Sequence, residues 1–479
     1  MSADYPKIDL YIDGVWRQGS EGVTSDVINP ADETVIGQVP HASQADIDEA
    51  LAAAERGFPV WRDMPIGERT RILKDAARIL RSRAEAIGRV MTMEQGKPVA
   101  EATGEAQRVA GTLEWDLEQA RRAYGRIIPF EPDVRLFVLR QPIGPVAAFV
   151  PWNFPAGSPM RKMAAALSAG CSVVLKAAEE SPASAAALIA CFVDAGLPKG
   201  VLNLLFGNPA EISSRLIASP IIRLVAFTGS IPVGKHLAQL AAAEMKPTLM
   251  ELGGHAPVIV CQDADPVKSA RASAFGKFIN AGQVCTSPSR FLVHESRYDA
   301  FVDAFAEAAR NLPVGNGLEP GIKMGPLANV RRLEAAQTLV ADARERGARV
   351  VCGGERIGNR GFFFAPTVLA DVPLDARIMV EEPFCPVAPI VPFTHLDDAL
   401  QIANALPFGL AAYGFTESAA TAATLTDRLE AGILSINHTG GSVSEAPSGG
   451  VKQSGYGREG GAEALDAYLI TKRVSHKLR

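Results

Sequence analysis

Apolar residues along this chain recur at two spacings, and segments of the two kinds alternate from residue 143 onward. Some segments are short, nearly continuous apolar runs: 143–150, 171–176, 201–207 and 221–229. The segments between them carry apolar residues at helical spacing: 159–170, 181–196 and 210–218. Apolar strands that alternate with helices are typical of a parallel sheet covered on both faces. The pattern therefore predicts an α/β domain over this part of the chain.

The same alternation starts again beyond residue 254 and predicts a second α/β domain. The expected strands are at 256–260, 290–294 and 348–354, and the expected helices are at 266–280, 296–311 and 328–346. An earlier helix, at 42–58, begins with Ser43 and has Asp46 three residues later. This spacing predicts a capping box at the start of that helix.

Two stretches fit neither domain. Residues 122–140 alternate apolar and polar side chains, which predicts an antiparallel hairpin, and residues 464–479 contain one more expected strand. Exposed strand edges tend to pair with other chains. We therefore expect these two stretches to form an arm that joins chains into a homodimer or homotetramer.

Composition places the chain among ordinary globular proteins. It has 479 residues, of which 47% are hydrophobic and 21% charged, and a net charge of -5. No basic stripe suggests nucleic-acid binding, because the basic residues of 69–83 alternate with apolar ones as on one solvated helix face. We expect no membrane span, since no uncharged apolar run reaches about 18 residues. The first residues lack a signal-peptide core, which predicts a cytoplasmic protein.

The cysteines and histidines give no metal-binding pattern. The six cysteines are too far apart in sequence for a CxxC pair or a zinc site, and the seven histidines form neither HxxxH nor HExxH. We expect reduced thiols and no bound metal. The cysteines stand at 171, 191, 261, 285, 352 and 385.

Two phosphate-binding motifs are nearly matched. Residues 227–236, FTGSIPVGKH, resemble a P-loop between a strand and a helix. His236 stands where that loop needs a hydroxyl for magnesium, so a phosphotransferase is a remote alternative. Gly229 and Ser230 at the turn could still seat a phosphate group at the helix N-terminus. GYGREG (455–460) fits G-x-G-x-x-G but lacks a preceding strand and a following βαβ unit, which favours a glycine-rich turn.

Cys285 raises the main question, because a lone cysteine usually packs in the interior. It stands in NAGQVCTS (280–287), and seven short motifs bear on its role. In chain order they are PWNFP (151–155), KAAEE (176–180), FTGS (227–230), MELGG (250–254), GQVC (282–285), EEPF (381–384) and SGGVKQSGYGREGG (448–461). In this order and spacing they resemble the aldehyde dehydrogenase superfamily over nearly the whole chain. Within it the chain is most similar to the succinate-semialdehyde and α-ketoglutarate-semialdehyde dehydrogenases.

The resemblance implies a fold in three parts. A Rossmann-like NAD-binding domain would take residues 1–121 and 141–250, and an α/β catalytic domain residues 251–447. A small β oligomerisation arm would take residues 122–140, together with the C-terminal tail at 448–479.

The resemblance also implies the chemistry. Cys285 would be the nucleophile that attacks a small-molecule aldehyde. The amide of Asn153 and the N–H of Cys285 would hold the oxyanion. Glu251 would be the general base, and Lys176 is counted with these catalytic residues. The product would be a carboxylic acid, released when the thioester on the cysteine is hydrolysed.

Cofactor binding follows from the same resemblance. Lys176 and Glu179 would hold the adenosine ribose, and a carboxylate there favours NAD, because it repels the 2′-phosphate of NADP. NADP stays possible but less favoured. Glu382 would bind the nicotinamide ribose and Phe384 would pack beside it. The remaining expected cofactor residues are Val150, Pro151, Trp152, Gly207, Phe227, Gly229, Ser230, Val233 and Leu252.

Departures from the pattern leave the substrate open. Of two arginines that hold the distal carboxylate in semialdehyde enzymes, Arg161 matches the first, but Ile279 stands where the second is expected. Arg290 could replace it, or could be a salt-bridge residue on the outer face. Ser448 replaces a phenylalanine near the substrate entrance, which would make the entrance wider or more polar. Cys385 replaces a glycine and would be strained if that glycine has a positive φ.

Three readings of the function stand beside the remote phosphotransferase alternative. A carboxylate-bearing semialdehyde is the preferred substrate, and an uncharged aromatic or aliphatic aldehyde is the alternative. A structural protein without catalysis is the third, against which the intact Asn153, Glu251 and Cys285 argue.

Overall fold

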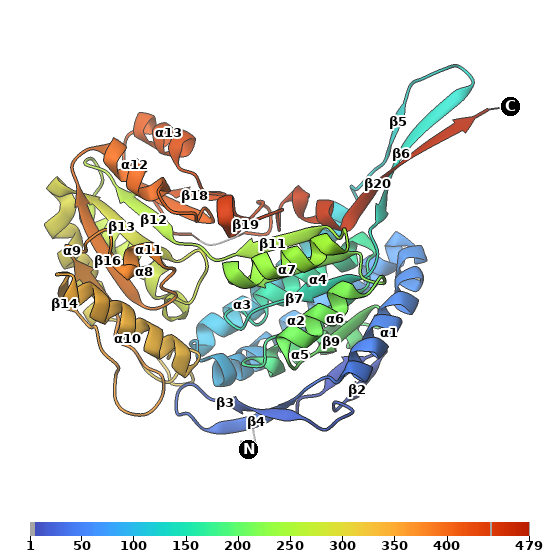
Figure 1. Cartoon of the computed structure of the whole chain (residues 1–479), viewed down its shortest axis with the longest axis horizontal. Coiled ribbons are helices and arrows are strands. Elements are labelled where there is room, and N and C mark those ends of the chain that lie inside the picture. Colours follow the sequence, from blue (N-terminus) through green and yellow to red (C-terminus); the bar gives the residue numbers. More distant parts are fainter. Residues whose placement is uncertain (1–4, 441–442, 479) are drawn as a thin grey trace.

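The computed structural model describes residues 5–440 and 443–478, which form two α/β lobes and a projecting arm (Figure 1). The parallel core of the first lobe has the strand order β11 (Thr248–Leu252), β10 (Leu224–Gly229), β7 (Val146–Phe149), β8 (Val173–Lys176), β9 (Leu202–Leu205). The chain runs from β7 outward to β9, then returns to the far side of β7 for β10 and β11. The strand order thus reverses between β7 and β10. In open parallel sheets, ligands bind beyond the carboxyl ends of the strands at such a reversal.

Short antiparallel strands flank this core. They are β19 (Gly455–Tyr456) beside β11, and β1 (Leu10–Ile12) and β2 (Val15–Arg17) beside β9. A separate hairpin near the N-terminus, β3 (Thr24–Ile28) and β4 (Val35–Pro40), was not predicted. The ends of the expected domains at residues 1–4 and 479 lie outside the described residues, and the domain boundaries stay a prediction.

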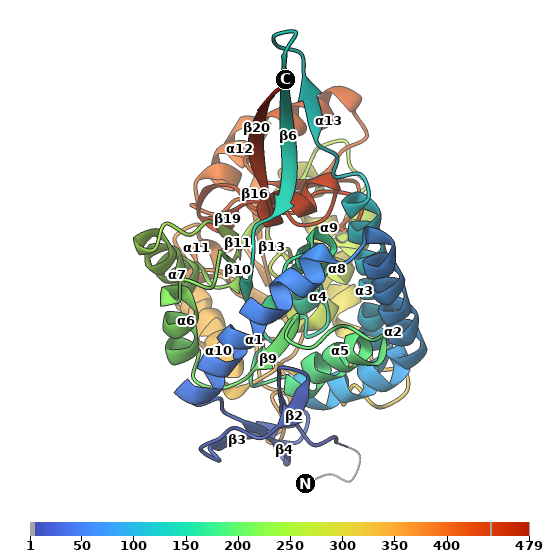
Figure 2. The same cartoon turned by 90° about the vertical axis from the view of Figure 1, so that its right-hand side faces the viewer.

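Helices cover both faces of the first sheet, and Figure 2 shows α6 and α7 on one side and α2 and α3 on the other. The alternation predicted from residue 143 is confirmed. So is the capping box, since the Ser43 hydroxyl accepts from the Asp46 N–H while the Asp46 carboxylate accepts from the Ser43 N–H. These helices are α1 (Gln44–Asp63), α2 (Ile66–Gln95), α3 (Val99–Ala120), α4 (Gly157–Ala169), α5 (Pro182–Asp194), α6 (Pro209–Ala218) and α7 (Ile231–Ala243).

The second lobe has its own sheet and its own buried apolar core. The strand order is β14 (Arg349–Cys352), β15 (Thr367–Ala370), β16 (Val387–Phe393), β13 (Pro288–His294), β12 (Ala256–Val260), β17 (Ala411–Phe415), β18 (Ile433–Ile436). Its helices are α8 (Pro266–Phe278), α9 (Glu295–Arg310), α10 (Val330–Glu345), α11 (Arg377–Val380), α12 (Leu396–Asn404) and α13 (Ala419–Arg428). Only residues 253–255 separate β11 of one lobe from β12 of the other, so the two sheets meet at this crossing.

The predicted hairpin and terminal strand are confirmed, and they pair with each other. β5 (Arg126–Ile128) and β6 (Val134–Pro142) form the hairpin, and β20 (Leu469–Lys477) pairs with β6 along its whole length. The three strands project from the body of the molecule (Figures 1 and 2). Within residues 5–440 and 443–478, no helix has the length and apolar character needed to cross a membrane.

Candidate active site

The two lobes bring the candidate catalytic residues together at the crossing between the sheets. Asn153 lies in the loop between β7 and α4, and its amide Nδ2 donates to the Gln283 carbonyl at 3.0 Å, two residues before Cys285. Glu251 stands near the carboxyl end of β11, and its charge acts directly on the Cys285 thiol. Cys285 lies in the turn before β13 and keeps part of its surface open. The thiol therefore lies in the interior but can still be reached.

Two glycines allow this approach. A side chain on Gly254 would place its Cβ 2.6 Å from the carbonyl oxygen of Cys285, and one on Gly253 would lie 2.4 Å from the carboxylate of Glu382. The Glu382 side chain could move aside for a Cβ at position 253, but the main-chain carbonyl of Cys285 leaves no room for one at position 254. The second glycine of the MELGG motif is thus required by close packing at the crossing.

The chain before the nucleophile is held in an unusual conformation. Asn280, Ala281 and Gly282 have φ angles of 50°, 53° and 73°, so three residues in succession are left-handed. For alanine this costs about 1–2 kcal/mol. At Gly282 a Cβ would also lie 2.3 Å from the Cys385 carbonyl oxygen. Such strain persists only where surrounding contacts fix the segment, which is common beside reactive groups.

The environment of Cys285 keeps its thiol protonated. Burial raises its pKa well above the usual value, and the negative charges of Glu251 and Glu382 raise it further, against the opposing effect of Arg161. A protonated thiol is a weak nucleophile. Attack on a carbonyl therefore needs a group that takes the proton as the sulfur reacts.

Glu251 is suited to take that proton. Burial raises its pKa to about 7, and the nearby carboxylate of Glu459 contributes in the same direction. Glu459 forms a buried ion pair with Lys162. Burial alone would raise the pKa of Glu459, but the positive charges of Lys162 and Arg161 hold it below its usual value. Of the two carboxyl groups, Glu251 and Glu459, Glu251 is therefore the one that titrates near neutral pH.

Arg161, at the start of α4, is half-buried among acidic groups. It acts on Glu251 and Glu459, and also on Asp116 of α3, whose pKa burial raises to about 7. Asp116 was not among the residues predicted from the sequence. It is 1% exposed within α3, and no motif in the sequence marks it, because its burial appears only in the packed structure.

Many of the expected cofactor residues lie along the carboxyl edge of the first sheet. At the end of β8, the Lys176 ammonium lies 2.7 Å from the Glu179 carboxylate, which also accepts from the Gly207 N–H at 2.9 Å beyond β9. Ser230 is the N-cap of α7 directly after β10, and Leu252 ends β11. This edge includes the reversal between β7 and β10, where open parallel sheets bind dinucleotides, and the N-terminus of α7 there offers main-chain N–H groups that suit a phosphate.

The other cofactor candidates lie near the crossing or on α7. Val150, Pro151 and Trp152 follow β7, Phe227 and Gly229 stand in β10, and Val233 is exposed on α7.

Glu382 and Phe384 close the site from the second lobe. One Glu382 carboxylate oxygen accepts from the Gly254 N–H at 3.1 Å, and burial raises the pKa of Glu382 to about 7. The Phe384 ring meets the edge of Trp152 at 5.7 Å between centroids. The expectation for Cys385 needs a correction, since the left-handed residue is Phe384, with φ 46°, and the fully buried Cys385 has no positive φ.

Arg290 also needs a correction. It is buried, and its guanidinium donates to the main-chain carbonyls of His255, Ile402 and Ala403. It is therefore neither an outer-face salt-bridge residue nor available as an anchor for a substrate carboxylate.

Ile279 and Ser448, the other departures from the pattern, flank the site. Ile279 is half-buried at the start of the strained segment before Cys285. Ser448 is buried, and its main chain exchanges two hydrogen bonds with that of Glu459, at 2.7 and 2.8 Å. Ser448 therefore lies beside the acid that faces Glu251.

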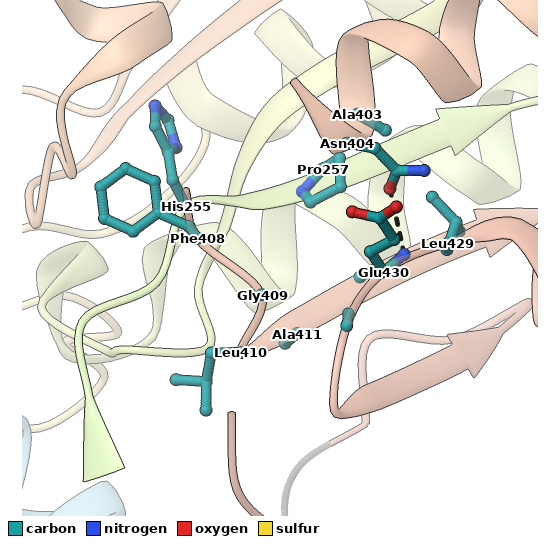
Figure 3. Close-up of a pocket in the computed structure, with 12 residues that line it drawn as sticks. His255, Pro257, Ala403, Asn404, Phe408, Gly409, Leu410, Ala411, Leu429 and Glu430 are labelled. Carbon is teal, nitrogen blue, oxygen red and sulfur yellow. Dashed lines mark hydrogen bonds between the residues drawn. The ribbon is translucent and has the colours of Figure 1, made fainter. Parts of the chain in front are cut away.

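A small pocket in the second lobe is separate from this site. Figure 3 shows His255 and Phe408 on one side of it and Asn404 and Glu430 on the other, and its volume is about 10 Å³, enough for one water molecule. The His255 ring is already hydrogen-bonded to Ser289 and to the Ile378 carbonyl. None of the candidate catalytic or cofactor residues lines this pocket.

Comparison with known proteins decides the family. The sequence profile of the Aldehyde dehydrogenase family matches residues 16–474. The chain belongs to the aldehyde dehydrogenase family. It is accordingly an aldehyde-oxidising oxidoreductase that uses NAD or NADP, and the predicted fold class is confirmed. The P-loop alternative does not fit this family.

Individual relatives cover nearly the whole chain. A putative 4-(hydroxymethyl)benzenesulfonate dehydrogenase of Comamonas testosteroni is 49% identical over 97% of both chains. The succinate-semialdehyde dehydrogenase [NADP(+)] of Escherichia coli strain K12 is 40% identical over 96% of both. The crystal structure of succinate-semialdehyde dehydrogenase from Burkholderia pseudomallei superposes with a TM-score of 0.97 at 38% identity, covering 100% of this chain and 99% of that one.

Proposed function

We propose that this aldehyde dehydrogenase uses Cys285 as its nucleophile, Glu251 as its general base and the Asn153 amide as an oxyanion donor. The observation that carries the proposal is the protonated Cys285 thiol beside a carboxylate whose pKa is about 7. The Asn153 amide has two N–H donors, and the Gln283 carbonyl takes one of them. The second is available to an oxyanion that forms at the cysteine.

The reaction would proceed in two halves. Glu251 takes the thiol proton, and the sulfur forms a bond to the aldehyde carbon, which places the negative charge on the former carbonyl oxygen. Bound dinucleotide would supply the acceptor for the hydride that leaves this carbon. A thioester remains on Cys285, and Glu251 releases the thiol proton to solvent. Glu251 then removes a proton from the water that attacks the thioester, and this proton returns to the sulfur as the sulfur leaves. The carbon–sulfur bond then breaks, and the carboxylic acid leaves.

We propose NAD as the preferred cofactor. The Glu179 carboxylate is fixed by Lys176 and the Gly207 N–H at the edge where the adenosine ribose would lie. A fixed negative charge accepts hydrogen bonds from ribose hydroxyls and repels a 2′-phosphate. Lys176 thus serves in cofactor binding, since its ammonium is paired at this edge. The name of the Escherichia coli relative includes NADP, so the preference of this chain needs its own test.

We propose an aldehyde with one acidic group, such as a carboxylate-bearing semialdehyde, as substrate. Arg161 is the cation near Cys285 that could attract the acidic group. The names of the relatives point the same way, since they include a benzenesulfonate and a succinate semialdehyde. An uncharged aldehyde is the second candidate, because Ile279 provides an apolar surface and the acids around Arg161 offset its charge.

We also propose that the chain forms a homodimer or homotetramer through its arm. The three-stranded sheet has an unpaired edge at β20, and several apolar side chains of the arm are exposed rather than packed. They include Ile127, which is 69% exposed, and Phe130, which is 63% exposed. Such a surface is typical of a contact between chains. The reduced Cys285 that the mechanism needs favours a cytoplasmic location.

The Cys285→Ala variant tests the proposed function directly. Without the sulfur no bond to the aldehyde carbon can form, so we expect no aldehyde-dependent rise in reduced-cofactor absorbance. Cys352→Ala, which removes the other partly exposed thiol, is the control and should keep full activity. Turnover by Cys285→Ala at the normal rate would contradict the proposal.

The pH dependence of kcat tests Glu251. Because its pKa is about 7 and only the ionised form accepts a proton, kcat should fall about tenfold per pH unit below pH 7. The Glu251→Gln variant should lose about 10²–10⁴-fold in kcat and should lose this acid limb. A limb that survives unchanged in Glu251→Gln would assign the titration to another group.

The Glu179→Gln variant tests cofactor preference. Glutamine keeps the size of the side chain and an acceptor for the Gly207 N–H but removes the charge. Repulsion of the 2′-phosphate should fall, so kcat/KM for NADP should rise about tenfold or more relative to NAD. Steady-state kinetics with both cofactors at one aldehyde concentration measures this ratio. An unchanged ratio would remove Glu179 from the argument.

The Ile279→Arg variant, with Ile279→Met as an uncharged control, tests the substrate. A second arginine should add a charge-assisted hydrogen bond of about 1.5–3 kcal/mol to a distal carboxylate. We expect a KM about ten- to hundredfold lower for succinate semialdehyde and unchanged for benzaldehyde. The wild-type comparison of the two aldehydes decides between the candidates, since a higher kcat/KM for benzaldehyde would favour the uncharged class.

A further inference from the structure

The turn between α2 and α3 reaches both loops of the active site, although the sequence motifs above did not include it. Gln95 and Lys97 in this turn are each 1% exposed. The turn also contacts the second lobe, where the Val99 N–H donates to the Gly317 carbonyl at 2.9 Å. The turn therefore belongs to the first lobe and also contacts the second.

Lys97 binds the main chain of Asn153. Its ammonium donates to the Asn153 carbonyl at 2.9 Å and to the Glu105 carboxylate at 2.6 Å, and it lies 4.3 Å from the centroid of the Phe154 ring. Burying a lysine cation is costly unless it is paired and hydrogen-bonded. Here the partners of the cation include the residue whose side chain would hold the oxyanion.

Glu105 holds the same loop from its other oxygen. While Oε2 accepts from Lys97, Oε1 accepts from the N–H groups of Ala156 at 2.9 Å and Gly157 at 2.8 Å. The buried pair therefore fixes the loop at three main-chain groups, on both sides of Phe154. A hydrophobic pair of the same volume could fill the space but could not bind these groups.

Gln95 connects this loop to the strained segment before the nucleophile. Its Nε2 donates to the side-chain oxygen of Asn280 at 2.8 Å, and its Oε1 accepts from the Lys97 N–H at 3.1 Å. The Asn280 amide in turn donates to the Asn153 carbonyl at 2.8 Å. One carbonyl thus accepts from Lys97 and from the segment that leads to Cys285.

We propose that Lys97, supported by Glu105 and Gln95, is a positioning residue for aldehyde oxidation. It fixes the Asn153 main chain so that the side-chain amide meets the oxyanion that forms on Cys285. The inference rests on the proposed oxyanion role of Asn153. A displacement of about 1 Å at a reacting group can cost about 10²-fold in rate, so a cation that holds the loop governs kcat without contacting substrate.

A kinetic double-mutant cycle between Lys97→Met and Asn153→Ala tests this. In the wild-type background we expect Lys97→Met to lower kcat by about 10²-fold with KM changed less than threefold. In the Asn153→Ala background the same substitution should change kcat less than threefold, because the amide it positions is gone. A merely structural lysine would lower stability but would not show this coupling.

Two further variants guard against a folding defect. The double variant Lys97→Met with Glu105→Gln removes both charges, so no buried carboxylate is left without its cation. Its kcat should be as low as that of Lys97→Met. Gln95→Leu enters the same cycle if the lysine variants do not fold. Glu94→Gln is the matched control. Glu94 is as buried as its neighbour Gln95, but its carboxylate accepts hydrogen bonds from the N-terminus of α5. This control should lower Tm without lowering kcat.

The outcomes separate the inference from the function on which it rests. If Asn153→Ala keeps full kcat, the oxyanion role fails, and the inference fails with it. If Asn153→Ala is slow but Lys97→Met loses its full 10²-fold in that background as well, only the inference is overturned. The inference is supported if Lys97→Met lowers kcat only in the enzyme that keeps Asn153.

Discussion

The active site depends on the close approach of two main-chain segments, the connection between the lobes at Gly254 and the turn of the second lobe at Cys285. No side chain fits between them, because a Cβ at position 254 would lie 2.6 Å from the cysteine carbonyl. This contact places the end of β11, and with it Glu251, against the turn that carries the thiol. Each lobe supplies part of the chemistry, so the reactive geometry exists only while this contact holds.

Charge then determines what the assembled groups can do. Three acids near the site, Glu251, Asp116 and Glu382, have pKa values of about 7, in each case raised first by desolvation. Lys162 and Arg161 offset part of this negative charge and keep Glu459 ionised. Burial raises the pKa of Cys285 as well, and the charges of Glu251 and Glu382 raise it further, so the resting thiol stays protonated and needs a proton acceptor to react. Burial thus shifts the pKa values of the candidate nucleophile and the candidate base in the same direction.

Sequence patterns predicted the parts of the fold that follow local rules. The alternating runs from residue 143, the capping box at Ser43 and the hairpin at 122–140 are each set by nearby residues, and the structure has all three. Arg290 could not be placed in this way, because its partners come from the distant His255, Ile402 and Ala403. Long-range burial decided its role, and no spacing in the sequence records that.

The α2–α3 turn shows the same limit at the active site. The sequence motifs identify the candidate catalytic and cofactor residues, which lie in strands or in the segments that flank them. Lys97 is in none of these motifs, and its pairing with Glu105 and the Asn153 carbonyl appears only once two helices and a loop are packed. Because Asn153 and Cys285 belong to different lobes, neither lobe alone can fix the distance between amide and sulfur. The α2–α3 turn supplies that constraint. Lys97 binds the loop that carries Asn153, and Gln95 binds the strained segment before Cys285.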